Sequence, residues 1–383
     1  MVFFLPDAIG GVYSVVNNLL NHVPDPGNVS VVAYSNECVR REQISTVNNN
    51  IRLIKFSYHC KDNIYHTVGR LGSLIRENKD CIIATDMLEL QMVQFLGLRQ
   101  PLVFIVLGDF EHYYSIAAGH QGIIDSFVAI SKEIYEKLCN LLPHRRKDIR
   151  LAYFPTPEVP EKRTAPPAQS LRIVYVSRLE ERKNPLLIPA IDAILKNRGR
   201  QVTITIVGDG PLRGQLEKAI GVQSNFRLAG FLDNQRLHEI YKENDVFLMT
   251  SESEGLPVSL IEAMKTGLVP VVSDIPGGIR EIVEHGKNGY LVDAADAAAF
   301  AGRIEALISS RELYNNMSAK AVEFADTTFD PTRCSQVYWD IVSEASRSAR
   351  VKTYSPAPPG ALDKKWLPNS VVRFLRNTKQ KSN

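Results

Sequence analysis

The segment from Ser251 to Pro270, SESEGLPVSLIEAMKTGLVP, restricts what this chain can fold into more than any other part of it. It follows the apolar run DVFLMT (245–250), which predicts a strand. Pro257 stands where the next helix would begin, and Gly267 stands just past its end. Because proline is favoured at the start of a helix and glycine after its last turn, we expect a strand, a loop and a short complete helix.

Two carboxylates, Glu254 and Glu262, lie eight positions apart in this segment. Glu254 falls in the loop at the start of the helix, and Glu262 lies roughly 8 Å along the axis from Pro257 at ~1.5 Å per residue. The N-terminus of a helix offers free backbone N–H groups and the positive end of the helix dipole, which together favour phosphate. One carboxylate would then lie near a bound phosphate and the other near an attached ribose, a geometry that suits a nucleotide-sugar.

Glu254-x7-Glu262 stands inside the longer pattern SxxEGLPxSLxEAMxxGxVPVV. This pattern resembles the donor site of retaining GT-B glycosyltransferases of the family-4 type (glycosyl transferases group 1). The resemblance implies that Glu254 contacts the donor sugar and that the donor is bound by Gly255, Leu256, Pro257, Val258 and Glu262. The alternative is a surface loop followed by an amphipathic helix with incidental charges. Because the strand, loop and helix expected around the motif match its usual context, we favour a site.

Length and composition indicate an ordinary globular protein. At 383 residues, with 44% apolar and 23% charged residues, two domains are expected. A net charge of +3 is too small to indicate nucleic-acid binding. The sequence has no apolar run of about eighteen residues and no basic region before its first apolar run, so we expect neither a transmembrane helix nor a signal peptide. The five cysteines are scattered without a Cys-x-x-Cys pair, which predicts reduced, mostly buried thiols in a cytoplasmic protein.

Short apolar strands alternate with helical patterns on both sides of a proline-rich stretch. This alternation predicts an α/β fold with two Rossmann-like, doubly wound domains, and the resemblance implies that they face a central cleft in the GT-B arrangement. We expect an N-terminal acceptor-binding domain and, after the linker, a donor-binding domain that is followed by a helix crossing back and a basic tail. The boundaries are 1–155, 156–170, 171–325, 326–350 and 351–383.

Three further positions of the second domain belong to the expected donor site. Arg178 and Lys183 follow the strand at 171–176, where ligands bind in open parallel sheets, and they resemble the residues that hold the donor diphosphate in the family. A solvated charge run is the alternative for both. Gly208 opens a Gly-x-Gly-Pro turn that the resemblance places beside the nucleotide. Phe231 corresponds to a loop that packs on the base, although a core position is equally compatible with it.

The first domain should hold the acceptor. Gly10 and Gly11 follow the first strand, and they resemble the family's glycine loop near the donor diphosphate, although a plain turn would use glycine as well. Asp109, a candidate catalytic residue, and the acceptor candidates His112 and Tyr113 follow the strand at 102–106. Similar bacterial enzymes have histidine where this chain has Leu107.

No Asp-x-Asp pair or metal-ligand spacing is present in the sequence, so no metal or other cofactor is expected.

The C-terminal stretch 351–383 carries seven basic residues against one acidic residue. Its part WLPNSVVRFLRNTKQK alternates apolar with basic residues, so it predicts either a helix that touches the inner face of a membrane or a basic tail packed on the first domain.

These patterns predict a retaining, metal-independent transferase that uses a nucleotide-sugar, carried by UDP, GDP or another nucleotide. The acceptor would be a saccharide or a lipid-linked sugar in polysaccharide or glycoconjugate synthesis. The resemblance implies that the acceptor attacks on the face that the leaving phosphate occupies. A nucleotide-sugar epimerase of the same fold and a non-catalytic nucleotide-sugar-binding subunit remain alternatives. The sequence specifies neither the sugar nor the acceptor.

Overall fold

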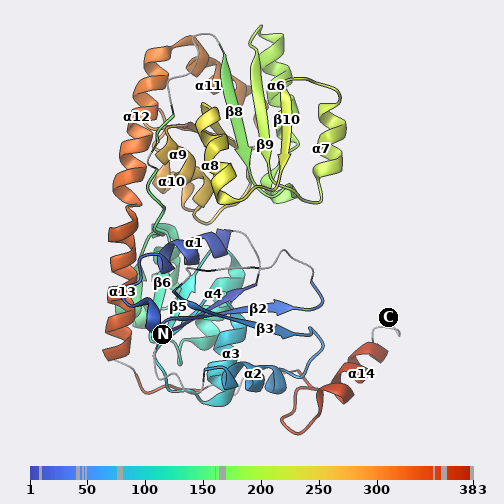
Figure 1. The fold of residues 1–383 in the computed structure, drawn as a ribbon, viewed down its shortest axis with the longest axis vertical. Coiled ribbons are helices and arrows are strands. Elements are labelled where there is room, and N and C mark those ends of the chain that lie inside the picture. The colour runs from blue at the N-terminus through green and yellow to red at the C-terminus, as the bar shows by residue number, and fades with distance from the viewer. Residues whose placement is uncertain are drawn as a thin grey trace. The chain divides into compact units, whose positions relative to one another are not determined.

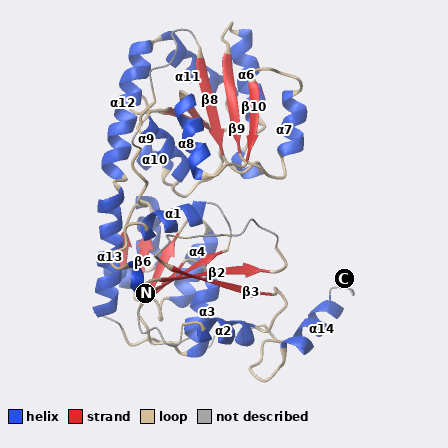
Figure 2. Ribbon diagram, in the orientation of Figure 1, coloured by secondary structure: helices blue, strands red, loops and turns tan. Residues whose placement is uncertain are grey.

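The computed structural model describes residues 1–7, 11–39, 44, 47, 50–75, 81–159, 161–163, 170–347, 350–354 and 360–379. The chain forms two compact units, each built on a parallel sheet with flanking helices (Figures 1 and 2). The first unit comprises Met1–Pro155 together with Thr332–Asn383, and the second comprises Thr156–Pro331.

The described part of the first unit contains a seven-stranded sheet in the order β3-β2-β1-β4-β5-β6-β7. Its strands are β1 (Val2–Pro6), β2 (Ser30–Asn36), β3 (Arg52–Tyr58), β4 (Ile82–Ala84), β5 (Leu102–Val106), β6 (Ser126–Ala129) and β7 (Ile149–Leu151). Its helices before the linker are α1 (Gly11–Leu20), α2 (Ile64–Ser73), α3 (Met87–Leu96), α4 (Glu111–His120) and α5 (Lys132–Leu141), with 3-10 turns η1 (Pro26–Asn28) and η2 (Pro143–Asp148).

The described part of the second unit contains a six-stranded sheet in the order β10-β9-β8-β11-β12-β13. Its strands are β8 (Leu171–Val176), β9 (Val202–Val207), β10 (Phe226–Gly230), β11 (Val246–Met249), β12 (Val269–Ser273) and β13 (Tyr290–Val292). Its helices are α6 (Leu187–Asn197), α7 (Arg213–Ile220), α8 (Asn234–Glu243), α9 (Val258–Thr266), α10 (Ile279–Ile282), α11 (Ala297–Ser309) and α12 (Arg311–Thr328), with the turn η3 (Glu181–Lys183).

Both sheets reverse their strand order at an equivalent point. The reversal lies between β1 and β4 in the first unit and between β8 and β11 in the second. The registered pairs are parallel, so the carboxyl ends of neighbouring strands meet at one edge of each sheet. Ligands of open α/β sheets bind at this switch point, which therefore locates the candidate site within each unit.

The strands form because they are buried on both faces. Ile173, Ile204 and Leu248 are essentially inaccessible to solvent, and helix residues such as Ile191 and Phe300 pack into the same core. Burying a side chain of this kind contributes roughly 1.5–3 kcal/mol. Continuous apolar runs of this type indicate parallel strands, which is why the sequence located them.

The chain returns to the first unit through α13 (Pro331–Arg347). Phe329 and Asp330 separate α12 from α13, so the expected helix at 326–350 begins at Pro331 and ends at Arg347. Within the first unit, the Trp339 indole donates to the His22 carbonyl at 2.8 Å, and the Tyr338 hydroxyl donates to the Ala152 carbonyl at 3.0 Å. These contacts attach α13 to the first unit.

The linker expected at 156–170 is partly packed onto the second unit. The Arg163 guanidinium is buried, donates to the Asp245 carboxylate and the Tyr314 hydroxyl, and lies over the Tyr314 ring. Lys162 reaches the Lys265 carbonyl at 2.9 Å. Pro160 and residues 164–169 lie outside the described residues.

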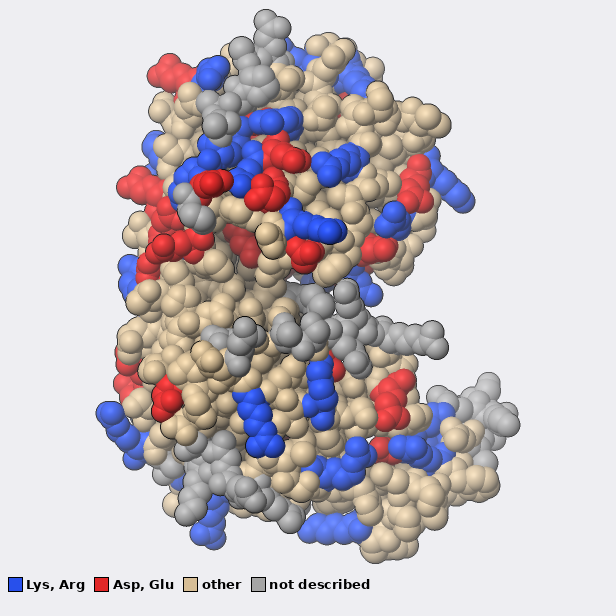
Figure 3. All heavy atoms as spheres, viewed as in Figure 1, with Lys and Arg blue, Asp and Glu red and all other residues tan. Residues whose placement is uncertain are grey.

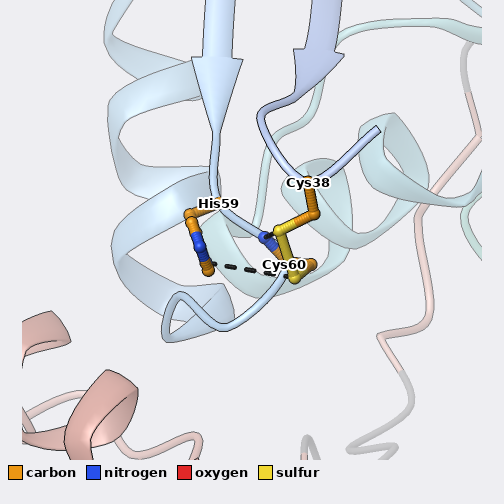
Figure 4. A group of neighbouring side chains, drawn as sticks. All are labelled: Cys38, His59 and Cys60. Carbon is orange, nitrogen blue, oxygen red and sulfur yellow. Dashed lines mark hydrogen bonds between the residues drawn. A yellow bond between two sulfur atoms is a disulfide. The ribbon is translucent and has the colours of Figure 1, made fainter. Parts of the chain in front are cut away.

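The expectation of five reduced cysteines is wrong for two of them. Cys38 and Cys60 form a disulfide with a Cα–Cα distance of 6.1 Å, and both are exposed (Figure 4). They meet because each follows one of two paired strands, in which Asn36 of β2 lies opposite Tyr58 of β3. Such a pairing depends on strand register, which cysteine spacing does not reveal. The remaining cysteines, Cys81, Cys139 and Cys334, are free and buried as expected.

Among the described residues, no helix combines the length and the apolar character that crossing a membrane requires.

Candidate active site at the carboxyl edge of the second sheet

Lys183 and Glu254 form an ion pair at the switch point of the second sheet. The Lys183 ammonium lies 2.6 Å from both carboxylate oxygens of Glu254, and both side chains are largely buried. The Ser251 hydroxyl donates to the same carboxylate at 2.7 Å. An anionic ligand that approached the ammonium would compete with Glu254 for it. The pair can therefore exchange a carboxylate partner for a phosphate and free Glu254 to accept from sugar hydroxyls.

Buried hydroxyls fix the turn that carries Lys183. The Tyr175 hydroxyl, from β8, donates to the Lys183 carbonyl at 2.9 Å, and the Thr250 hydroxyl, after β11, donates to the Lys183 and Asn184 carbonyls at 3.1 and 2.8 Å. Asn184 has φ of 44°, a left-handed conformation that asparagine tolerates. Tyr175 and Thr250 were not predicted as site residues, although a tyrosine near the end of β8 and a threonine just after β11 were a usable signal.

Arg178 lies on the same edge and is mostly exposed. Its Nε atom lies 3.5 Å from a carboxylate oxygen of Glu180. The neighbouring Glu180 also pairs with Arg182 at 3.2 Å. Local ion pairs therefore connect Arg178, Glu180 and Arg182. The structure thus brings Lys183 and Glu254 together, while the role expected for Arg178 in phosphate binding stays a prediction.

Glycines are required where backbone segments of this edge touch. Gly208 has φ of 130°, and a Cβ there would lie 1.9 Å from the Ser177 carbonyl oxygen. Gly277, with φ of 111°, is also crowded, because its Cβ would be 2.4 Å from the Glu254 carbonyl oxygen. Gly278 donates its N–H to the Gly255 carbonyl at 2.8 Å. We had not assigned Gly277 and Gly278, whose position just after β12 was the signal that could have revealed them.

The helix after Glu254 has the expected cap at each end, displaced by one residue at its start. Pro257 is the N-cap residue and α9 begins at Val258, whereas Gly267 ends it with φ of 101°. Proline cannot donate a backbone hydrogen bond, so either position suits it. Gly255 and Leu256 precede the helix, and Leu256 is buried. The first turn of α9 thus follows directly on the loop that holds Glu254.

Glu262 lies on α9 and is only partly accessible to solvent. Burial raises the pKa of its carboxyl to about 7, and a hydrogen bond with Tyr241 opposes this rise only in part. Tyr241, on α8, is buried and also donates to the Ser259 carbonyl at 3.2 Å. A carboxyl whose pKa is raised in this way, one turn from the start of α9, can donate a hydrogen bond when protonated and accept one when ionised.

Phe231 follows β10, and its ring is about half exposed rather than part of the core. Gly230, just before it, has φ of 69°. An exposed aromatic ring after a strand end is available for stacking on a flat ligand.

The expected acceptor residues lie at the carboxyl edge of the first sheet. Asp109 accepts from the Tyr114 hydroxyl at 2.5 Å and from the Lys137 ammonium at 2.6 Å. Its carboxylate is therefore already engaged inside the first unit. Sequence reasoning had not anticipated Lys137, which lies on α5, because its contact with Asp109 joins two elements.

His112 and Tyr113 lie in the first turn of α4. The His112 Nε2 atom lies 3.2 Å from a carboxylate oxygen of Asp86. The rings of His112 and Tyr113 meet edge to face. His112 is exposed, whereas burial raises the pKa of the Tyr113 hydroxyl to about 12. Leu107, at the position where similar enzymes have histidine, is half-buried.

A buried carboxyl lies behind this surface. Glu89 completes a capping box with Asp86 at the start of α3 and accepts from the Thr85 and Asp86 backbone N–H groups at 2.9 and 3.0 Å. Burial raises the pKa of Glu89 to about 7.

Of the two glycines expected near the donor diphosphate, Gly11 is the first residue of α1 and Gly10 lies outside the described residues.

The described residues contain one close group of metal-ligand types, namely Cys38, His59 and Cys60, whose ligand atoms lie within 4.8 Å of one another. Figure 4 shows their arrangement at the ends of two neighbouring strands. Because the sulfurs are joined in a disulfide, they offer no thiolates to a metal in this state.

Part of the chain, which includes Lys183 and Glu254, matches known proteins in sequence. Residues 159–324 match the family model "Glycosyl transferases group 1". The amylovoran biosynthesis glycosyltransferase AmsK of Erwinia amylovora is 41% identical over 144 residues, which is 35% of each chain. The putative colanic acid biosynthesis glycosyltransferase WcaL of Escherichia coli is 38% identical over 151 residues, or 37% of this chain and 36% of WcaL. The aligned segments thus span about a third of the length of these relatives.

Solved structures resemble the whole fold at low identity. The Anabaena protein Alr3699/HepE, crystallised with UDP and glucose, superposes with a TM-score of 0.73 at 19% identity, covering 89% of this chain and 98% of that one. Sucrose-phosphate synthase from Thermosynechococcus elongatus gives 0.70 at 16% identity, covering 90% and 99%. The chain therefore has the GT-B class of fold, with two Rossmann-like domains, and its second unit carries the sequence pattern of the group 1 glycosyltransferases.

Proposed function

We propose that this chain is a retaining glycosyltransferase that takes a sugar from a nucleoside diphosphate-sugar. The acceptor would be a saccharide or a lipid-linked sugar in polysaccharide or glycoconjugate synthesis. The observation that carries the proposal is the buried Lys183–Glu254 pair, which lies at the switch point of the second sheet, directly before the α9 N-terminus. The pair falls inside the segment that matches the glycosyltransferase family model.

The charges that develop during sugar transfer indicate which groups would catalyse it. Breaking the bond between the anomeric carbon and the phosphate leaves a cation-like sugar and an additional negative charge on the diphosphate. Fixed positive groups aimed at that charge are the main catalytic means available. Lys183, Arg178 and the backbone N–H groups at the start of α9 would supply them without a metal. Glu262 would accept from the ribose hydroxyls, and Phe231 would stack on the base.

Glu254 would contact the donor sugar once the diphosphate has engaged Lys183. Retaining glycosidases instead use two opposed carboxylates, one of them as a nucleophile. The resemblance of the motif around Glu254 to retaining GT-B enzymes implies a different route. We propose that the acceptor attacks from the face of the leaving phosphate, which takes up the acceptor's proton. Asp109, His112 and Tyr113 would act on the acceptor side, in the cytoplasm.

The first test is a thermal-shift panel of UDP-, GDP-, dTDP- and ADP-sugars with the wild type and Glu262→Ala. UDP-sugars lead the panel because the solved HepE complexes contain UDP or UDP-glucose. A donor present at 100 times its Kd should stabilise the protein by about 2.7 kcal/mol, and Glu262→Ala should lose that shift. If no donor stabilises the protein at millimolar concentration, the proposal fails.

A second measurement separates the remaining functions. A transferase releases nucleoside diphosphate from the stabilising donor in the presence of acceptor, and Glu254→Ala abolishes the release. An epimerase changes the sugar without releasing nucleotide, and a binding subunit does neither. Binding without release by the wild type, over a panel of saccharide and lipid-linked acceptors, would therefore favour the binding subunit.

A further inference from the structure

Helix α14 (Asn369–Lys379) contacts the first unit through its polar side. Arg373 pairs with the Asp62 carboxylate, Asn369 accepts from the Asn63 backbone N–H at 2.8 Å, and Arg376 donates to the Asp62 carbonyl at 2.6 Å. These three positions are spaced at about one helical turn, so they share one side of the helix. The polar side of α14 therefore faces the turn between β3 and α2.

The segment before α14 strengthens this attachment. The Asn63 side-chain amide donates to the Lys364 and Leu367 carbonyls at 2.7 and 2.6 Å. Asp363 accepts from the Ile64 backbone N–H at 2.9 Å and pairs with Arg376 at 2.8 Å. Polar bonds thus hold the segment 360–377, and of its large apolar side chains Val372 is buried.

The opposite side of the same helix exposes apolar side chains to solvent. Phe374 is 65% exposed and Val371 41%, and Trp366, just before the helix, is 77% exposed. Val371 and Phe374 are three residues apart and lie on one face. In Figure 1 this helix lies at the edge of the first unit, and Figure 3 shows Lys and Arg side chains among mainly uncharged surface there.

This orientation is the reverse of a normal surface helix. An amphipathic helix of a globular protein buries its apolar side and exposes its polar side. Here ion pairs hold the polar side inward, which leaves aromatic and aliphatic groups outward. Exposed apolar patches of this kind mark interaction surfaces. The interaction partner must therefore be something that accepts Trp366, Val371 and Phe374.

We propose that this face of α14, together with Trp366, inserts into the interfacial layer of an anionic membrane. Lys364 and Lys365 are exposed beside Trp366, whereas the acidic Asp363 is already paired. Cationic residues flanking aromatic and aliphatic groups are the composition of helices that lie in a membrane interface. The eleven residues of α14 span about 16 Å, too short to cross a bilayer, so the helix would lie in its plane.

Charge favours a lipid surface over a second copy of the chain. Two copies meeting through this face would bring their lysines together, and like charges oppose association. An anionic lipid surface instead attracts each exposed lysine within about 10 Å at 0.1 M salt. This inference goes beyond the proposed transfer reaction. Its test requires neither donor nor acceptor, so a failure of either proposal leaves the other standing.

The test is vesicle flotation of the full chain with neutral phosphatidylcholine vesicles and with vesicles containing phosphatidylglycerol. We expect binding to the anionic vesicles that weakens with added salt. The double variant Val371→Ser, Phe374→Ser should reduce it at least tenfold, and Trp366→Ser should reduce it several-fold. Val222→Ser, which removes a fully exposed apolar residue from the second unit, is the matched control and should bind as the wild type does.

Tryptophan fluorescence supplies an independent readout. The chain has two tryptophans, and Trp339 is buried with its indole bonded to His22. A blue shift on adding anionic vesicles, quenched by brominated lipid and absent in Trp366→Phe, would place Trp366 in the interface. Failure to bind anionic vesicles, or binding that the double variant leaves intact, would overturn the proposal. So would a concentration-dependent dimer that the double variant dissociates, because a second copy would then cover the face.

Discussion

The two sheets share a topology but differ in how their functional edges are built. At the second edge, Lys183 and Glu254 are largely buried, and Gly208 and Gly277 allow loops after different strands to touch. At the first edge, Asp109 is tied to Lys137, and His112 lies exposed beside Asp86. The matching family model likewise covers 159–324, inside the second unit. The comparison teaches that the second edge is held by close backbone contacts, as the proposed nucleotide site would require, whereas the first edge is held by ion pairs of its side chains.

The largest expected difference is in the rate of sugar transfer between variants of Lys183 and Lys137, one lysine at each edge. Lys183→Met removes the positive group proposed to meet the leaving diphosphate, so sugar transfer should fall by about 100-fold or more. Lys137→Met removes the partially exposed partner of Asp109, and exposed pairs are worth about 0–1 kcal/mol, so donor-dependent turnover should fall less than about fivefold. Initial rates at saturating donor measure both, with melting temperatures as a folding control. Equal losses would remove the distinction between the edges.

Backbone packing at the second edge predicts the next largest effect. Gly208 and Gly199 both have positive φ, but a Cβ would meet the Ser177 carbonyl at Gly208 and open space at Gly199. Gly199→Ala should cost roughly 1–2 kcal/mol from its left-handed backbone alone. Gly208→Ala should cost roughly 1–3 kcal/mol more and weaken donor binding. Chemical denaturation and donor titration of both variants check this, and equal stability would contradict a tight turn at Gly208.

Two glutamates with raised pKa values, one at each edge, allow the edges to be compared by pH. Burial raises the pKa of both Glu89 and Glu262 from 4.5 to about 7, so the folded state favours their protonated form. Each contributes stability that is fully present below about pH 4.5 and is lost as the pH rises through about 7, at most roughly 3 kcal/mol for each. Glu89→Gln and Glu262→Gln should each flatten the fall in melting temperature over this range.

Ligand binding should depend on only one of these glutamates. An ionised carboxylate accepts from ribose hydroxyls better than a protonated one, so nucleotide-sugar affinity should rise as the pH increases through about 7. Glu262→Gln should abolish this dependence, while Glu89→Gln should retain it. Calorimetric titration from pH 5.5 to 8.5 gives the answer. A dependence that survives in Glu262→Gln would exclude Glu262 as the ribose partner.

The smallest effect should come from Phe231. If its exposed ring stacks on the base, Phe231→Ala should weaken donor binding about fivefold, since such contacts are worth about 1 kcal/mol. Phe110→Ala, which alters a partly exposed aromatic residue of the first unit, should leave donor affinity unchanged. The same titration compares the two. An effect of Phe110→Ala as large as that of Phe231→Ala would mean that donor binding is not confined to the second unit.

Sequence patterns located most strands and the donor-side motif because both depend on local chemistry. Continuous apolar runs predict buried parallel strands, and proline before α9 with glycine after it predicts that helix to within one residue at its start. The three-residue strand β7, just before the proline-rich stretch, is too short for its sequence to carry a clear signal.

The sequence by itself determined the alternation of strands and helices, the spacing of Glu254 and Glu262 and the crowding of glycines at strand ends. Those features follow from steric and hydrophobic preferences that act over a few residues. Only the tertiary structure decided that Lys183 meets Glu254, that Cys38 meets Cys60 and that α14 turns its polar side inward. Each of these depends on strand order, register or docking, which bring together residues far apart in the chain. Long-range contacts of this kind are set by the packing of the whole sheet, and no local pattern encodes them.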